Sequence, residues 1–294
     1  MGRADWDSIR PDPELGIGRA TPWVVERIRR WVGPVVRLLF RPRLDGVEHL
    51  PDDRPFLLVA NHSAGMGIAE IFSFTWLYVD RIGPERPLAA MAHPEGFRLE
   101  PLRSVHRHIG TIPSTYAAAA DALADGVPIL VFPGGGYETQ RPIWQANRVD
   151  FGGRRGYVRI AHRAGVPIVP MAIRGSHYTA PILLRARWLA HALVLPRLVF
   201  GEKRWSLSLL GLLGALGLLF SDLWLPLRIG LIWLWLSLPL MFLPIVPASI
   251  RFRIGQPVPL DDLGDDIDAM GERVEDAIQS LLDGAGADGE PSGS

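Results

Sequence analysis

The chain has 294 residues, and its 31 lysines and arginines balance 31 aspartates and glutamates, for a formal net charge of +0 at pH 7. A nucleic-acid-binding surface needs a basic excess to displace counterions from phosphates, so this balance argues against nucleic acid as a partner. The absence of cysteine excludes disulfides, thiolate nucleophiles and cysteine-based metal sites. With 48% hydrophobic and 21% charged residues, the composition is that of a globular chain with a sizeable core.

The N-terminal region divides into two predicted segments. Residues 1–21 lack a basic stretch followed by an apolar one and a cleavage site, so we predict no secretory signal and expect a flexible arm. In residues 22–43, hydrophobic residues such as Trp23 and Trp31 alternate with arginines. This pattern predicts a basic amphipathic helix, interrupted near Gly33, that lies in a membrane interface. The alternative is a surface helix packed on the domain.

Short apolar runs alternate with helix-prone segments in the central part of the chain. Predicted strands cover residues 55–60, 88–92, 127–132 and 166–173, and an edge strand follows at 249–254. Strands that alternate with helices predict an α/β sheet, whose ligands usually lie beyond the carboxyl ends of the strands. The end of the chain, residues 284–294, is rich in Gly, Ser and Pro and is predicted to be a disordered tail.

The strongest compositional change lies in residues 205–250, where the only charged residues are Asp222 and Arg228. Of its two uncharged stretches, 229–250 reaches the length of about 20 apolar residues that a membrane span needs, and 205–221 is marginal. Basic residues flank the whole segment, which by the positive-inside rule predicts a hydrophobic hairpin inserted from the cytoplasm. Prolines in the second stretch leave a shallow, re-entrant insertion as an alternative. A buried apolar helical subdomain is another.

His62 lies just after the first predicted strand, at a strand-to-loop junction. A neutral imidazole there can accept a proton from a hydroxyl, which is general-base chemistry. Ser63 supports a rival interpretation, because residues 61–65 resemble a degraded G-x-S-x-G elbow of a serine hydrolase. That motif lacks its first glycine here, and a hydrolase elbow follows several strands rather than one.

A glycine-rich loop follows the third predicted strand. Gly134, Gly135 and Gly136 let backbone N–H groups approach a phosphate or a developing oxyanion closely, and Glu138 and Arg141 come next. The loop matches neither of the two common nucleotide-binding patterns, so NTP or NAD binding is not predicted. The other histidines of the chain show no metal-ligand spacing, and we predict no metal site.

Five blocks follow one another along the chain: Leu-Val-Ala-Asn-His at 58–62, Gly-Thr-Ile-Pro-Ser at 110–114, Val-Phe-Pro-Gly-Gly-Gly-Tyr-Glu at 131–138, Arg-Arg-Gly at 154–156 and Val-Pro-Ile-Val-Pro at 166–170. In order and spacing they resemble the glycerolipid and lysophospholipid acyltransferase superfamily (PlsC-like), over about residues 44–259. The Phe-Pro-Gly-Gly sequence of the third block is closer to its diacylglycerol acyltransferase-like and TMEM68-like branch. Phosphatidate-forming members have Phe-Pro-Glu-Gly-Thr-Arg there.

The resemblance implies a mixed, mostly parallel sheet flanked by helices, in an acyltransferase domain over residues 44–283 that contains the hydrophobic insertion. His62 is then the base of the family's His-x4-Asp motif, whose aspartate is replaced by Gly67. Glu70, about 80° around a helix from His62, is an imperfect substitute for that aspartate. The substrate-binding positions that the resemblance implies are Ser63, Pro133, Gly134, Gly135, Gly136, Glu138, Arg141 and Arg154.

The implied donor is acyl-CoA or acyl-carrier protein, a co-substrate rather than a cofactor, and the implied acceptor is a membrane lipid at the cytoplasmic face. Phosphatidate-forming relatives pair an arginine with the acceptor phosphate, whereas this chain has Ile-Pro-Ser at 112–114. This difference favours a neutral acceptor such as mono- or diacylglycerol, with Arg141, Arg154 or Arg155 as other sources of charge. One alternative, favoured by Gly67, is an inactive member that binds lipid. Another is an integral membrane protein whose soluble part is incidental.

Overall fold

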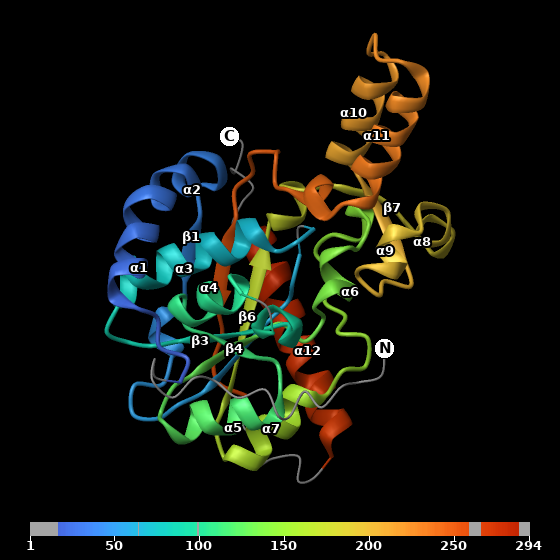
Figure 1. The fold of residues 1–294 in the computed structure, drawn as a ribbon. Coiled ribbons are helices and arrows are strands. Elements are labelled where there is room, and N and C mark those ends of the chain that lie inside the picture. Colours follow the sequence, from blue (N-terminus) through green and yellow to red (C-terminus); the bar gives the residue numbers. More distant parts are fainter. Residues whose placement is uncertain (1–16, 64, 99, 259–265, 288–294) are drawn as a thin grey trace, which may run out of the picture.

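The computed structural model of the protein describes residues 17–63, 65–98, 100–258 and 266–287 (Figure 1). Most of the predicted N-terminal arm, residues 1–21, and the end of the predicted tail therefore lie outside the described residues. The last helix, α12 (Ile267–Ala287), continues past residue 284, where the tail is predicted to begin.

A seven-stranded sheet forms the centre of the fold, in the order β1-β9-β6-β2-β5-β3-β4. Its strands are β1 (Arg43–Asp45), β2 (Leu57–Ala60), β3 (Ala89–Ala92), β4 (Thr111–Pro113), β5 (Ile129–Val131), β6 (Ile168–Arg174) and β9 (Arg251–Ile254). Every neighbouring pair is parallel except β6 and β9, which confirms the predicted mixed, mostly parallel α/β sheet. The predicted edge position of the last strand is wrong, because β9 pairs with β1 on one side and with β6 on the other.

Helices cover both faces of this sheet. The α-helices are α1 (Pro22–Arg27), α2 (Gly33–Phe40), α3 (Ile68–Ile82), α4 (Leu102–His108), α5 (Tyr116–Ala124), α6 (Gly136–Thr139), α7 (Gly156–Ala164), α8 (Arg187–Leu193), α9 (Leu195–Leu198), α10 (Leu209–Leu219), α11 (Leu225–Ser237) and α12. Leu57 and Val59 of β2 pack in a core with α5, α7 and α12, and Leu58 and Ala60 pack on the opposite face with α2 and α3. Burial on both faces explains why this strand is apolar at every position.

The predicted basic amphipathic helix is present, but its interruption near Gly33 is not. A π-helical segment (Ile28–Val32) joins α1 directly to α2, so the chain is helical over residues 22–40. Gly33 serves close packing instead, since a Cβ atom there would lie 2.6 Å from the Nε1 atom of Trp76 on α3. The helix packs on the domain through one face and leaves large apolar side chains such as Leu38 exposed on the other.

The predicted insertion, residues 205–250, does not form a pair of membrane-length helices. After β8 (Trp205–Ser208), α10 and α11 make a short hairpin that projects from the top of the body in Figure 1. They have 11 and 13 residues, so at about 1.5 Å per residue neither reaches the about 30 Å of a bilayer core. The second stretch breaks after Ser237, because Pro239 begins a 3-10 turn there. No helix among the described residues is long and apolar enough to cross a membrane.

A smaller subdomain lies next to this hairpin. Its strands, β7 (Ile182–Ala186) and β8, pair antiparallel, and α8 and α9 lie between them in the sequence. Its core is separate from the two cores of the large sheet and consists of Ile182, Ala190, Trp205, Met241 and Phe242. The Ser206 hydroxyl donates to the Gln140 side-chain oxygen (3.1 Å), which ties this subdomain to the loop that follows β5.

Candidate active site

The loops after β2, β5 and β6 meet at the carboxyl edge of the sheet, where α/β folds usually bind ligands. β2 leads into Asn61 and His62, β5 into the glycine-rich loop, and β6 into Ser176 and His177. Asn61 joins two of these ends: its Nδ2 donates to the Ile173 carbonyl (2.9 Å), and its Oδ1 accepts from the Ile173 N–H (2.7 Å). The strand end that carries His62 is thereby fixed against β6.

His62 and Glu70 are in direct contact. The Nδ1 atom of His62 meets Oε1 of Glu70, whose side chain is fully buried. The same carboxylate accepts from the Ser63 N–H (3.1 Å) and from the Ser63 hydroxyl (3.0 Å). The imidazole stacks on Phe132 with ring centroids 4.3 Å apart, and 12% of the His62 side chain is exposed. With Nδ1 held by a fixed carboxylate, Nε2 is the nitrogen that can exchange a proton with a substrate.

A tight turn brings His62 and Glu70 together. α3 begins only at Ile68, and Gly65 and Gly67 have φ values of +64° and +71°, in the left-handed region that favours glycine. The predicted angle of about 80° on a shared helix is therefore wrong, because His62 does not lie on α3. The turn places the imidazole against residue 67, where a Cβ atom would lie 2.2 Å from the Cε1 atom of His62. An aspartate at this position has no room, and the carboxylate comes from Glu70 instead.

Ser63 is fully buried and supports Glu70. Its hydroxyl donates to that carboxylate and contacts the hydroxyl of Ser176, which is also buried. Among the hydrogen bonds of the described residues, none joins the Ser63 hydroxyl to His62. A serine hydrolase needs that contact to activate its nucleophile, so the geometry does not support the rival interpretation. Ser63 has no exposed surface and orients Glu70, and its substrate-binding role stays a prediction.

The glycine-rich loop wraps around the side chain of Glu138. Pro133 and Gly134 follow β5, and Gly134 must be glycine because a Cβ atom there would lie 2.2 Å from the Cγ atom of Glu138. Gly135 turns the chain with a φ of +45°. Gly136 then opens the short helix α6, and a Cβ atom there would meet open space. At Gly136, therefore, no side chain covers the backbone of the loop.

Glu138 joins this loop to His62. It is buried, its Oε2 accepts from the His62 backbone N–H (2.9 Å), and its Oε1 lies 3.5 Å from Nη2 of Arg141. Burial raises the pKa of Glu138 to about 8, although the His62 N–H and Arg141 act in the opposite direction. The two oxygens of Glu138 accept backbone N–H groups from His62 and Asp150. The predicted substrate-binding residue Glu138 is thus a buried link between the two loops.

Three arginines are predicted sources of charge at the site, and the structure separates their roles. Arg141 is buried and donates to two backbone carbonyls, and its substrate-binding role stays a prediction. Arg155 is paired with two acidic side chains of α12. Arg154 is exposed and donates to the Gly134 carbonyl (2.6 Å) at the outer side of the loop. Of the three, only Arg154 is exposed beside the loop.

His177, considered above only as a metal ligand, belongs to the same site. It lies in a 3-10 turn (Ser176–Tyr178) after β6 and is buried. Burial lowers the pKa of His177 to about 4, and the charges of Arg141 and His62 act in the same direction. Within the described residues, its Nε2 is buried without a hydrogen-bond partner. A neutral imidazole with a free ring nitrogen therefore lies close to His62, and no motif in the sequence indicates it.

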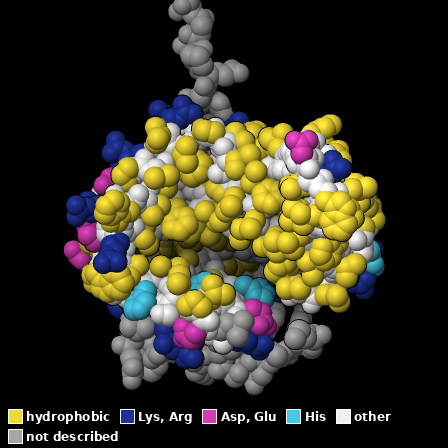
Figure 2. All heavy atoms as spheres, turned by 45° about the horizontal axis from the view of Figure 1, so that its top comes forward, with side chains coloured by type: hydrophobic (Ala, Val, Ile, Leu, Met, Phe, Trp, Pro, Cys, Tyr) yellow, Lys and Arg dark blue, Asp and Glu magenta, His cyan; other side chains and the backbone are white. Residues whose placement is uncertain are grey.

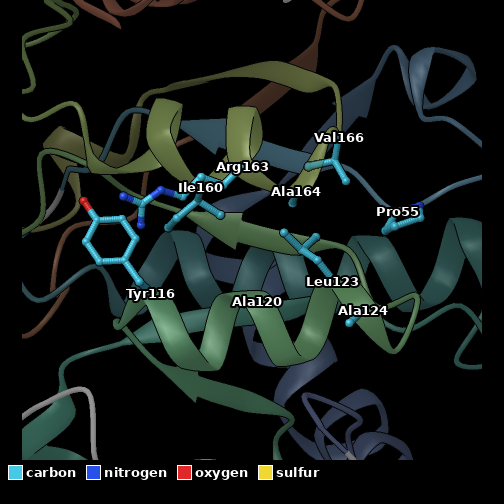
Figure 3. A pocket seen from close by; sticks show the side chains of 9 residues that line it. All are labelled: Pro55, Tyr116, Ala120, Leu123, Ala124, Ile160, Arg163, Ala164 and Val166. Carbon is cyan, nitrogen blue, oxygen red and sulfur yellow. The ribbon is translucent and has the colours of Figure 1, made fainter.

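The face near the α10–α11 hairpin is apolar, and a cavity lies elsewhere in the molecule. Figure 2 brings the top of Figure 1 forward and shows hydrophobic side chains over most of that face, around a hollow near its centre. A separate cavity of about 370 Å3 lies between α5 and α7 (Figure 3), where the Arg163 guanidinium sits 5.6 Å from the Tyr116 ring. None of the predicted site residues lines it. Over the part of the chain that the structure describes, no group of three or more His, Asp or Glu side chains is placed to hold a metal ion.

Two comparisons with known proteins agree with this architecture. Residues 41–174, which include His62, Glu70 and the glycine-rich loop, match the family described as Acyltransferase. The crystal structure of PlsC, the 1-acyl-sn-glycerophosphate (LPA) acyltransferase of Thermotoga maritima, is similar with a TM-score of 0.52 and 17% sequence identity. That likeness covers 90% of this chain and 80% of PlsC, and at this identity it concerns the fold alone.

Curated relatives include uncharacterized mycobacterial proteins. One from Mycobacterium tuberculosis is 31% identical over 172 residues, which cover 56% of this chain and 47% of the relative. One from Mycobacterium leprae is 30% identical over 160 residues, which cover 53% of this chain and 42% of the relative. The chain thus spans about half the length of the curated relatives it matches.

The class of fold follows from the sheet and from the likeness to PlsC. The mostly parallel sheet flanked by helices has a PlsC-like fold. Within the chain, residues 41–174 are similar to the Acyltransferase family.

Proposed function

We propose that the protein transfers a fatty acyl group from an acyl thioester to a hydroxyl of a glycerolipid or related lipid alcohol, with His62 as the general base. The observation that carries this proposal is the contact between His62 Nδ1 and the buried carboxylate of Glu70. A carboxylate in this position orients the imidazole and stabilises its protonated form, as in triad enzymes. Glu70 thus supplies what the aspartate at residue 67 supplies in the His-x4-Asp motif.

The proposed reaction needs no covalent enzyme intermediate. Glu70 keeps the proton on Nδ1, and Nε2 of His62 takes the proton from the acceptor hydroxyl. The alcohol oxygen attacks the thioester carbonyl carbon, and the resulting oxyanion lies near the backbone of residues 134–136. The C–S bond then breaks, and the leaving thiolate takes the proton from Nε2. The products are an ester and a free thiol, and His62 returns to its neutral form.

The acceptor that we propose is a neutral lipid alcohol such as mono- or diacylglycerol. The Ile-Pro-Ser sequence at 112–114 carries no cation, and both Arg141 and Arg155 are engaged within the protein. Arg154 remains as the exposed cation of the three. These features, with the Phe-Pro-Gly-Gly sequence, support the diacylglycerol acyltransferase-like branch of the family. The proposed donor is acyl-CoA or acyl-carrier protein.

Acyl transfer to a panel of lipid acceptors tests this proposal. Labelled acyl-CoA and acyl-carrier protein are supplied to the full chain in membranes, and His62→Ala is compared with the wild type. We expect product with a neutral acceptor and a loss of at least about 10³-fold in rate for His62→Ala, because the variant lacks the imidazole that takes up the hydroxyl proton in the proposed reaction. His162→Ala, which removes an exposed histidine of α7, is the control and should retain the wild-type rate.

The other outcomes point to the alternative. If the wild type acylates no acceptor but binds lipid, the inactive lipid-binding interpretation takes the place of the enzyme. If His62→Ala turns over as fast as the wild type, another group is the base. The alternative rested on Gly67, and the contact of Glu70 with His62 weakens that argument.

We further propose that the protein works at the cytoplasmic surface of a membrane. The tip of the α10–α11 hairpin exposes Phe220 (81%) and Trp224 (75%), and the N-terminal helical segment exposes Trp31 (70%). The Arg30 guanidinium lies 5.8 Å from the Trp31 ring, a pairing suited to the headgroup region. Exposed apolar patches of this extent mark contact surfaces, and the apolar face in Figure 2 suits an enzyme whose acceptor lies in the bilayer.

Vesicle flotation tests this location. Phe220→Asp/Trp224→Asp should lower the vesicle-bound fraction at least about tenfold, because two large side chains lose their burial in lipid. The vesicles contain phosphatidylcholine and phosphatidylglycerol. Tyr116→Asp is the control, since Tyr116 is an exposed aromatic residue of α5, which lies at the end of the molecule away from the hairpin in Figure 1. Equal flotation of the double variant and the wild type would show that the hairpin tip does not contact the membrane.

A further inference from the structure

A basic pocket lies beside the glycine-rich loop, in the subdomain of β7, β8, α8 and α9. The cavity has a volume of about 620 Å3. The cationic side chains that line it, and that define the basic pocket, are Arg185, Arg187, Arg197, Lys203 and Arg204. The acidic residue in the lining is Glu202. The walls therefore concentrate positive charge in a chain whose formal net charge is +0.

The lining holds five cations and one carboxylate, Glu202, which interacts with Arg185. Among the salt bridges of the described residues, none includes a cation of the basic pocket. Burial lowers the pKa of the Arg185 guanidinium, and the charge of Arg204 acts in the same direction. Burial also raises the pKa of Glu202, and the charge of Arg185 acts in the opposite direction, so this single carboxylate offsets part of the charge of Arg185. A bound anion would relieve the repulsion between the guanidinium groups.

Arg185 connects the basic pocket to the candidate active site. Its Nη1 donates to the Tyr137 carbonyl (2.9 Å), and its guanidinium lies 5.7 Å from the Tyr137 ring. The next residue, Glu138, accepts the backbone N–H of His62. The Nε atom of Arg185 is buried and has no hydrogen-bond partner among the described residues. An unsatisfied buried donor on the wall of a pocket is a group that a ligand can satisfy.

We propose that the basic pocket binds the phosphate groups of the acyl donor, namely the pyrophosphate and the ribose phosphate of a coenzyme A thioester. Guanidinium groups bind phosphate oxygens in a bidentate geometry. A cluster of five cations around one carboxylate matches a ligand with several phosphates better than the single phosphodiester of most lipid headgroups. Because the basic pocket lies beside Tyr137, the phosphates of the donor can bind in this pocket while its thioester reaches His62. This inference rests on the proposed function, because it names the donor of that reaction.

Equilibrium binding to the full chain is the first test. Coenzyme A, which carries the phosphates, is compared by calorimetry with pantetheine, which carries none. We expect coenzyme A to bind at least about 100-fold more tightly, and Arg187→Glu and Arg204→Glu each to weaken it at least about tenfold. Both arginines are exposed, so the variants should keep the wild-type unfolding temperature. Arg159→Glu, at an exposed arginine of α7, is the control and should bind coenzyme A like the wild type.

Kinetics and vesicle binding identify the source of the phosphate. The variants should raise the KM for acyl-CoA about tenfold, without a change in kcat and without slowing transfer from acyl-pantetheine. If Arg187→Glu and Arg204→Glu bind coenzyme A like the wild type but bind anionic vesicles more weakly, the pocket binds a lipid headgroup and the proposal is overturned. Equal affinity for coenzyme A and pantetheine, or use of acyl-carrier protein without coenzyme A binding, would also overturn it. If the wild type binds coenzyme A through these arginines but transfers no acyl group, the proposed function fails while the pocket assignment stands.

Discussion

Replacing Glu70 by glutamine is expected to lower kcat for acyl transfer by about 10²- to 10⁴-fold. Glutamine has the size of glutamate, but its amide does not stabilise an imidazolium and can offer an N–H to Nδ1 of His62, which favours the wrong tautomer. The acceptor KM should change little, because Glu70 is fully buried and meets His62 and Ser63 rather than solvent. Steady-state rates of the full chain with its preferred donor and acceptor measure both quantities.

Two comparisons make this result specific to the pair. Asp80→Asn removes an exposed carboxylate of the same helix, α3, and should leave kcat unchanged. His62→Ala/Glu70→Gln should be no slower than His62→Ala, because Glu70 acts through His62 and the effects of residues that work as a unit are not additive. A folded Glu70→Gln variant with the wild-type kcat would contradict the assignment of Glu70 as the residue that orients His62.

Introducing the family aspartate at residue 67 should inactivate the protein rather than improve it. We expect Gly67→Asp to lower kcat by at least about 100-fold and the free energy of unfolding by about 2–4 kcal/mol. The Cβ atom would lie 2.2 Å from the Cε1 atom of His62, so the imidazole must leave its contact with Glu70. Residue 67 also has a φ of +71°, which side chains other than glycine adopt at a cost. Acyl-transfer rates and urea unfolding curves measure the two effects.

Gly126→Asp separates backbone strain from the clash with the imidazole. Gly126 has a φ of +74°, close to that of Gly67, and no atom lies within 4 Å of an added Cβ. This variant should lose part of the stability and none of the activity. If Gly67→Asp were as active as the wild type, the observed position of His62 would not be the catalytic one.

The central sheet follows from local sequence, because its strands are buried on both faces. β2, β3, β5 and β6 carry apolar runs without alternation, and a short run of this kind between turn residues is typical of a parallel strand. β1 and β4 have three residues each, like β5, but only β5 lies within a longer apolar run, at residues 127–132. The position of β9 inside the sheet depends on its pairing with β1, which lies far away in sequence.

The candidate site was predictable in its main residues and not in its contacts. His62 and the glycine-rich loop follow predicted strands, so the ordering of parallel strands places them at one edge of the sheet. The pairing of His62 with Glu70 depends on the left-handed turn at Gly65 and Gly67, which a helical extrapolation from His62 misses. His177 comes close to His62 only because β6 lies next to β2. No local pattern carries that information.

The hydrophobic insertion shows the same division between local composition and tertiary contacts. The sequence by itself determined that residues 205–250 are an apolar segment and that strands and helices alternate. It also determined that His62 follows one strand and that the glycine-rich loop follows another. Only the tertiary structure decided that the segment becomes two short helices joined to β8, and that Glu70 rather than residue 67 supplies the carboxylate. The physical reason is that strand burial is encoded residue by residue. Helix ends, turns with positive φ and contacts across the sheet depend instead on groups that come together only when the chain folds.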